Sequence, residues 1–228
     1  MQAPPVGISS VSVGPIEDRF AGLGTGKVLL VGCHGCTLRC AFCQNHDVSH
    51  VLPVDPDESA ASWIANEASG LRGVLFTHSE PIVARKLVRD VSLLVRPSLV
   101  AAKTSAHCDE ATFRSFMESV DAINVDVKGG ADDYRELCDG NFDLVVRNVA
   151  LAKSMGKHVE LTFLIIPGRR GLRKVAREMA LVAGDSTVWI VGFVPANLMR
   201  DWPMARKSHL ESAFSQIRDH FKEVKTPY

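Results

Sequence analysis

Six short apolar runs, spaced along most of the chain, constrain the fold more than any other feature of this sequence. The runs are rich in Val, Ile and Leu and are bounded by polar or turn-forming residues, as is typical of buried parallel strands. They lie at residues 27–32, 73–77, 98–104, 122–128, 158–166 and 187–194. Each run is therefore expected to form one strand.

A segment with helical periodicity follows each run. Pro81 suits the first turn of a helix, and Gly70 and Gly156 suit the residue after its end. Helices are expected within residues 57–69, 81–95, 109–120, 142–155, 172–183 and 206–221. Alternating strands and helices predict a parallel sheet with right-handed crossovers. Since six units are fewer than the eight of a complete barrel, we expect an α/β fold, a partial (β/α)6 TIM-like barrel with an open side.

The length and composition suit one hydrophobic core. The chain has 228 residues, of which 46% are hydrophobic and 23% are charged. These proportions are those of an ordinary globular domain. Residues 22–228 are therefore expected to form a single domain, and residues 1–21 a peripheral N-terminal lead-in.

Opposite charges balance in this chain, which has 26 basic and 26 acidic residues. This balance removes the general attraction for nucleic acids or anionic membranes. No run reaches the roughly 18 apolar residues of a membrane span, and the N-terminus lacks the plan of a signal peptide. We expect a cytoplasmic protein with no nucleic-acid or membrane partner. Thiols stay reduced there, so clustered cysteines indicate metal binding or catalysis.

Four of the six cysteines lie within residues 32–45, GCHGCTLRCAFCQN, directly after the first expected strand. Barrel enzymes place their chemistry at this end of the strands. The gaps between the cysteines are two, three and two residues. A structural zinc site usually sets its two pairs farther apart, and a ferredoxin run has another spacing. A compact thiolate loop favours an iron–sulfur cluster, because several irons can each take one nearby sulfur.

The last three of these cysteines carry a family resemblance. Cys36, Cys40 and Cys43, with Phe42 before the last one, have the three-then-two spacing of the radical S-adenosylmethionine (radical SAM) enzymes. Later motifs resemble the branch related to pyruvate formate-lyase activating enzyme, over roughly residues 27–203: THSEP (77–81), DAINVDVKG (121–129), VELTFLIIPG (159–168) and GFVPANLMRD (192–201). The resemblance implies a radical SAM core, a six-stranded partial barrel.

The resemblance also implies the cofactors and the chemistry. Three thiolates, from Cys36, Cys40 and Cys43, would hold three irons of a 4Fe-4S cluster and leave the fourth iron open to SAM. An external one-electron donor, such as flavodoxin or ferredoxin, would reduce the cluster. Cleavage of SAM would then give a 5'-deoxyadenosyl radical that takes hydrogen from a substrate. The cofactor carries the difficult chemistry, and the protein binds, orients and excludes water.

By the same resemblance, further residues are candidates for binding SAM. Phe42 would lie by the adenine. The family's second-strand motif, which binds the SAM amino group, falls on His78, Ser79 and Glu80. His78 is equally consistent with a hydrogen-bonded scaffold role, and Glu80 with a position before a helix-starting proline.

The later strands supply the remaining candidates. Asp126 and Lys128 match an Asp-x-Lys motif on one strand face, and Lys128 suits the SAM carboxylate. The pair is also consistent with a strand-end ion pair. Thr162 matches a position whose side chain approaches SAM in the activating enzymes. Val194 occupies a place that is often His in relatives.

One departure from the activating enzymes lies after the third expected strand. Lys103, before Thr104, stands where those enzymes carry an Asp that helps to hold a monovalent cation near SAM. The ammonium of Lys103 would replace that cation or reach the substrate. Cys108 is a second candidate for the substrate side. Cys33 is interpreted as a buried bystander at the strand end.

The residues leave three functions open. The first is hydrogen abstraction from a small-molecule or peptide substrate, favoured by THSEP and Lys103, which depart from the activators' usual residues. The second is activation of a glycyl-radical enzyme, in which the substrate is a glycine of a partner protein. The third is a non-enzymatic iron–sulfur electron carrier, which would have no use for the SAM motifs.

Overall fold

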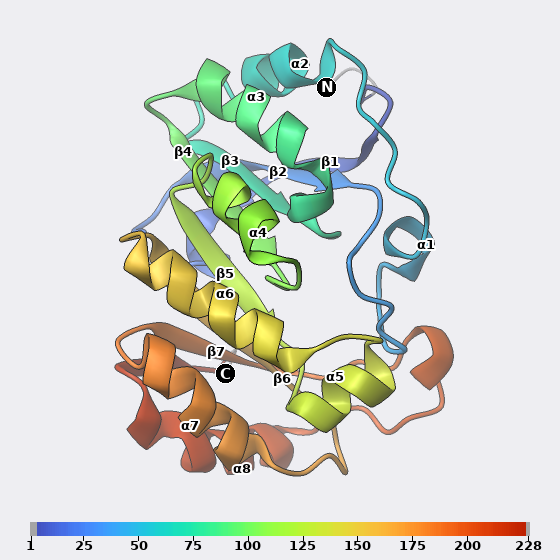
Figure 1. Ribbon diagram of the computed structural model, residues 1–228, viewed down its shortest axis with the longest axis vertical. Helices are drawn as coiled ribbons and strands as arrows, with labels where there is room; N and C mark the ends of the chain where they lie inside the picture. The colour runs from blue at the N-terminus through green and yellow to red at the C-terminus, as the bar shows by residue number, and fades with distance from the viewer. Residues whose placement is uncertain (1–3, 227–228) are drawn as a thin grey trace. The chain divides into compact units, whose positions relative to one another are not determined.

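The computed structural model describes residues 4–226 of the chain (Figure 1). These residues belong to two compact units. Within these residues, unit 1 comprises 4–37, Asn45–Thr104 and Asp109–Asn124, and unit 2 comprises Leu38–Gln44, Ser105–Cys108 and 125–226. The residues of the cysteine loop are divided between the units, because Cys36 belongs to unit 1 and Cys40 and Cys43 belong to unit 2.

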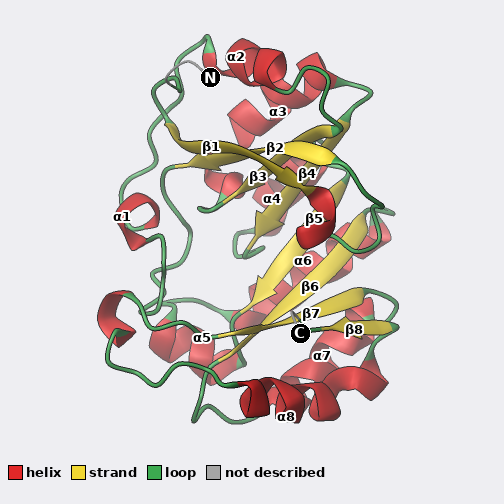
Figure 2. Ribbon diagram, turned by 180° about the vertical axis from the view of Figure 1, so that it is seen from behind, coloured by secondary structure: helices red, strands yellow, loops and turns green. Residues whose placement is uncertain are grey.

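Unit 1 is built on strands that follow one another in chain order. Its elements are β1 (Ile8–Pro15), η1 (Ile16–Asp18), β2 (Lys27–Cys33), α1 (His46–Ser49), α2 (Ala60–Glu67), β3 (Gly73–Thr77), η2 (Pro81–Ala84), α3 (Arg85–Val95), β4 (Leu99–Thr104) and α4 (Glu110–Met117). Parallel pairing sets Leu30 opposite Leu75 and Leu75 opposite Ala101. Strand β1 is antiparallel to β2, and Figure 2 shows the two side by side.

Unit 2 repeats the alternation of strands and helices. Strand β5 (Ala122–Val127) begins in unit 1 and ends in unit 2. The other elements of unit 2 are α5 (Ala131–Leu137), α6 (Phe142–Ser154), β6 (His158–Ile165), α7 (Leu172–Ala183), β7 (Thr187–Gly192), η3 (Asn197–Met199), α8 (Lys207–Ile217), η4 (Arg218–His220) and β8 (Glu223–Lys225). Strands β6, β7 and β8 pair in parallel.

The predicted α/β fold with parallel strands is confirmed. The six expected strands are β2 to β7, and each lies within two residues of its expected bounds. Strand β6 is buried on both faces, because Val159, Leu161 and Phe163 alternate with the buried Glu160 and Thr162. Helices α6 and α8 contact this strand. That residues 22–228 form one domain stays a prediction.

The segment before β2 contributes to the core of unit 1. Ile16 and Phe20 are fully buried among Val28, Leu75 and Ala101. Large apolar side chains that are removed from water in this way stabilise a fold by their transfer energy and by close packing.

Replacing Phe20 with Ala is expected to lower the free energy of unfolding by about 3–5 kcal/mol, because it leaves a cavity in this cluster. Urea unfolding followed by circular dichroism measures the loss. Val13 of β1 is 45% exposed and provides the control, since Val13→Ala should change stability by no more than about 0.5 kcal/mol. Equal effects of the two substitutions would show that Phe20 is not a core residue.

Candidate SAM and cluster site

In unit 1, the loop after β3 forms hydrogen bonds with residues near both ends of the cysteine loop. The backbone N–H of Glu80 donates to the carbonyl of Gly35 at 3.3 Å. The side-chain amide of Asn45 donates to the carbonyl of His78 at 2.7 Å. His78 has a left-handed backbone, with φ of 71°, which is uncommon for a residue with a β-carbon. Two motifs that are separate in sequence therefore form one structural element.

Glu80 is almost fully buried, at 1% exposure. Its carboxylate accepts a hydrogen bond from Thr104 Oγ1 at 2.6 Å and another from the backbone N–H of Ile82 at 3.2 Å. The second bond caps η2, which begins at Pro81. Glu80 therefore has the helix-capping role expected from its position before Pro81. Thr104, a candidate for binding SAM, donates its hydroxyl hydrogen to Glu80.

Replacing Glu80 with Ala is expected to lower the free energy of unfolding by about 1–3 kcal/mol, because it removes the acceptor of two donors, one of them the buried Thr104 hydroxyl. Glu80→Gln keeps an acceptor oxygen and should lose less. Denaturant titration of the two variants measures the difference. Stability equal to that of the unmodified protein in both variants would contradict this structural role.

A hydrogen bond joins the side chain of Ser79 to the backbone of Cys33. Ser79 Oγ accepts a hydrogen bond from the N–H of Cys33 at 3.2 Å. Burial raises the pKa of the Cys33 thiol to about 12, and the side chain is 3% exposed. A thiol that stays protonated is a poor metal ligand, which supports the interpretation of Cys33 as a bystander.

His78 points its ring at the N-terminal strand. Its Nδ1 lies 2.8 Å from Ser10 Oγ of β1. Partial burial and the nearby Arg19 lower the pKa of His78 below its usual value. The imidazole is therefore neutral at physiological pH.

In unit 2, the loop that carries Cys40 and Cys43 is held by two later motifs. The N–H groups of Arg39 and Ala41 donate to the carbonyls of Cys138 and Leu137, at 2.9 and 2.7 Å. These carbonyls lie at the C-terminal end of α5, where a helix leaves acceptors without intrahelical donors. The cysteine loop therefore caps α5.

Residues after β7 also form hydrogen bonds with this loop. The side-chain amide of Asn197 donates to the carbonyl of Cys40 at 3.3 Å. The N–H of Leu198 donates to the carbonyl of Ala41 at 2.9 Å. Phe42 is 7% exposed and packs edge-on against Phe193, with 6.4 Å between ring centroids.

Lys128 supplies the positive charge beside Cys40. Its Nζ lies 3.8 Å from Asp126 Oδ2, and its side chain is 17% exposed. Burial opposes the charge of Lys128, but Asp126 and Cys40 outweigh it and raise the pKa of the ammonium. A hydrogen bond from the Cys138 thiol, with help from Lys128, lowers the pKa of Cys40. Cys40 therefore lies where its thiolate form is stabilised.

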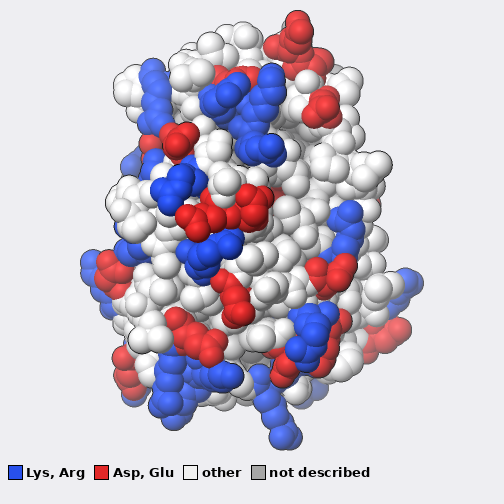
Figure 3. Space-filling model, in the orientation of Figure 1, with Lys and Arg blue, Asp and Glu red and all other residues white. Residues whose placement is uncertain are grey.

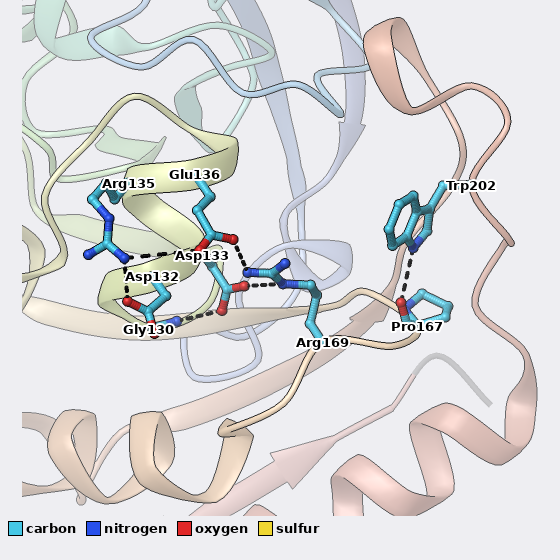
Figure 4. A network of polar contacts seen from close by, with 8 residues as sticks. All are labelled: Gly130, Asp132, Asp133, Arg135, Glu136, Pro167, Arg169 and Trp202. Carbon is cyan, nitrogen blue, oxygen red and sulfur yellow. Dashed lines mark hydrogen bonds and ion pairs between the residues drawn. The ribbon is translucent and has the colours of Figure 1, made fainter.

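Lys128 also lines a cavity of about 170 Å³ in unit 2, together with Gly129 and Arg169. Figure 4 shows how the loop at Arg169 is fixed. The guanidinium of Arg169 pairs with Asp133 at 2.5 Å and with Glu136 at 2.8 Å, both on α5. Trp202 Nε1 donates to the carbonyl of Pro167 at 3.0 Å. Arg169 is therefore held in place by two carboxylates of α5.

The other candidates occupy separate positions. Thr162 is buried on β6, and Val194 is 47% exposed after β7. Lys103 is half-buried on β4 in unit 1. Cys108 belongs to unit 2, where the side-chain amide of Asn148 donates to its carbonyl at 2.9 Å.

The donor chemistry of the cysteine loop fits a cluster. Among residues 4–226, no group of three or more His, Cys, Asp or Glu side chains is arranged to hold one metal ion. None of the six cysteines of this part of the chain forms a disulfide. A 4Fe-4S cluster takes each cysteine on a different iron, so its ligands need not converge on one point. Three thiols within eight residues supply this donor set.

Residues 30–178 match the model of the radical SAM superfamily, which is more than half of the chain. The chain belongs to the radical SAM superfamily. The family predicted from the cysteine spacing is thereby confirmed. The cofactors of the family, a 4Fe-4S cluster and SAM, are those of this radical SAM protein.

A protein of another organism matches most of this chain. The uncharacterized protein MJ0808 of Methanocaldococcus jannaschii is 27% identical over 208 residues, which are 86% of this chain and 58% of that protein. The chain thus spans less than two thirds of the length of this relative.

Solved structures share the fold at low sequence identity. A radical SAM methyltransferase from Sphaerobacter thermophilus is 12% identical, with a TM-score of 0.67 over 100% of this chain and 78% of that one. A domain of pyruvate-formate lyase-activating enzyme from Bacteroides vulgatus is 12% identical, with a TM-score of 0.55 over 68% of this chain and 98% of that one. SuiB of Streptococcus suis bound to S-adenosylmethionine is also 12% identical, with a TM-score of 0.59 over 88% of this chain and 52% of that one. These likenesses confirm the predicted fold class.

Two surface properties complete the description. No helix within residues 4–226 is both long and apolar enough to cross a membrane. Basic and acidic side chains are interspersed on the face drawn in Figure 3, with neither sign gathered into a single field.

Proposed function

We propose that this radical SAM protein holds its 4Fe-4S cluster through Cys36, Cys40 and Cys43 and abstracts hydrogen from a small-molecule or peptide substrate. The single observation that carries the ligand assignment is the environment of Cys40. Asn197 holds the carbonyl of Cys40, the C-terminal end of α5 holds both neighbouring backbone amides, and Leu198 holds the next carbonyl along the chain, so the loop is fixed before any cofactor binds. When bound, the cluster supplies the electron that splits SAM into methionine and a 5'-deoxyadenosyl radical.

Lys128 and His78 suit the two polar groups of the amino-acid part of SAM, the carboxylate and the amino group. Lys128 is a half-buried cation and would offer its ammonium to the carboxylate. His78 is neutral and does not repel an ammonium group. Phe42, packed against Phe193, offers an aromatic surface for the adenine. Glu80 and Thr104 support the loop that carries His78.

The substrate class rests on the departures from the activating enzymes. THSEP and Lys103 both differ from the residues usual in that branch. Lys103 and Cys108 are the proposed substrate-side residues. The second candidate, activation of a glycyl-radical enzyme, is supported by the likeness to the activating-enzyme domain from Bacteroides vulgatus. An electron carrier is disfavoured, because it has no need of candidate SAM-binding residues such as Lys128 and His78.

A fractionation experiment tests the substrate class. Cell extract is divided by ultrafiltration into a small-molecule and peptide fraction and a protein fraction, and each is added to reduced, reconstituted protein with SAM. Faster formation of 5'-deoxyadenosine with the first fraction is expected. Acceleration by the protein fraction alone, with a glycyl-radical signal in electron paramagnetic resonance (EPR), would replace this proposal by the activating function.

A further inference from the structure

The N-terminal strand β1 reaches the candidate SAM site through a bulge. Ile8 pairs with Cys33 and Ser10 pairs with Gly32, so that Ser9 is an extra residue between two adjacent partners. A bulge of this kind re-aims side chains and is frequent beside active sites. Ser9 and Ser10 therefore both meet the end of β2, where the cysteine loop begins.

Gly32 leaves the space that these serines occupy. A β-carbon at Gly32 would collide with Ser10 Oγ, lie 2.8 Å from Ser9 Oγ and lie 3.4 Å from the β-carbon of His78. The hydroxyl groups of Ser9 and Ser10 and the β-carbon of His78 therefore all lie close to the backbone of Gly32. Only a glycine permits this approach.

Ser9 carries a hydroxyl group that the fold does not use. Its Oγ is buried and has no hydrogen-bond partner within residues 4–226. Buried polar atoms are nearly always hydrogen-bonded, and an orphaned one at this position indicates a partner that binds. Ser10 differs, because its Oγ lies 2.8 Å from Nδ1 of His78.

We propose that β1 completes the SAM subsite, with Ser10 as a positioning residue for His78 and Ser9 as a direct contact. The inference rests on the proposed function of His78. The amino group of SAM offers N–H donors, so His78 must present a lone pair to it. It does so at Nε2 when Nδ1–H donates to Ser10 Oγ. In the arrangement that we propose, Ser10 Oγ accepts from Nδ1–H and so stabilises the tautomer whose Nε2 accepts a hydrogen bond from the amino group of SAM.

Nuclear magnetic resonance of the apoprotein tests the tautomer without the cofactors. The ¹⁵N shifts of His78, assigned by their loss in His78→Gln, should report Nδ1–H in the unmodified protein. In Ser10→Ala the Nε2–H tautomer should grow, because Nδ1–H loses its acceptor. Ser12→Ala, on the exposed part of the same strand, is the control and should match the unmodified protein. An unchanged spectrum in Ser10→Ala would overturn the inference.

Equilibrium dialysis with reconstituted protein tests the effect on SAM. Ser10→Ala and Ser9→Ala should each weaken SAM binding about tenfold, the effect of one hydrogen bond. Ser12→Ala should leave the dissociation constant unchanged, and Ser10→Thr, which keeps the hydroxyl, should restore it. The double variant Ser10→Ala/His78→Ala should bind no more weakly than His78→Ala, because Ser10 acts through His78.

Two outcomes separate the proposals. If the unmodified protein binds SAM and the Ser10 and Ser9 variants bind it equally well, the role of β1 is wrong and the proposed function stands. If the unmodified, cluster-loaded protein binds no SAM, the proposed function fails and the role of β1 fails with it.

Discussion

Replacing Cys40 with Ala is expected to abolish both the 4Fe-4S cluster and SAM cleavage. The same result is expected for Cys36→Ala and Cys43→Ala, because each proposed ligand would hold a different iron and no other thiol of the loop is suited to replace it. Cys33 is the nearest substitute in sequence, but burial holds its pKa at about 12 and keeps it protonated. Iron and sulfide analysis, with EPR of the reduced protein, measures cluster content.

Cys33→Ala is the matched control for these variants. It removes a thiol from the same loop region without removing a proposed ligand, so cluster content and SAM cleavage should remain near those of the unmodified protein. A Cys33→Ala protein without a cluster would contradict the assignment of the three ligands. A Cys40→Ala protein with a full cluster would contradict it equally.

Replacing Lys128 with Met is expected to weaken SAM binding by about 10- to 100-fold, because a hydrogen bond to a charged group contributes about 1.5–3 kcal/mol. The substitution keeps the length of the side chain and removes its charge, and it also removes the ion pair with Asp126 at 3.8 Å. Equilibrium dialysis of SAM with reconstituted protein measures the change.

Two further variants make the Lys128 result specific. Lys128→Arg keeps the charge but spreads it over a planar group, so it should recover part of the affinity. Lys86, on the exposed face of α3, has a side chain that is 84% exposed and lies in unit 1. Lys86→Met should bind SAM like the unmodified protein. Unchanged affinity in Lys128→Met would remove Lys128 from the site.

Most of the strands that could be predicted are buried on both faces. Continuous apolar runs such as residues 73–77 mark them unambiguously, and β3 matches that run. Strands β1 and β8 are not predicted, for two physical reasons. The sequence of β1, ISSVSVGP, is half-exposed and rich in serine, and β8 has three residues. Helix α5 is also missed, because its short sequence ADDYREL has a single fully buried side chain, that of Tyr134.

The candidate site could be predicted where chemistry depends on spacing along the chain. The cysteine spacing and the Asp-x-Lys motif are local patterns, and both led to the correct family. Contacts such as Asn45 with His78 and Asn197 with Cys40 join distant segments. They depend on tertiary packing, and an isolated asparagine in the sequence does not reveal its partner.

The identity of the nucleoside formed from SAM tests the central claim most directly. Protein reconstituted with iron and sulfide is reduced anaerobically and mixed with SAM, and the products are identified by mass spectrometry. We predict 5'-deoxyadenosine in the unmodified protein and none in Cys40→Ala. Methylthioadenosine in its place, or intact SAM with a protein that retains zinc, would contradict reductive cleavage by a cluster held at Cys36, Cys40 and Cys43.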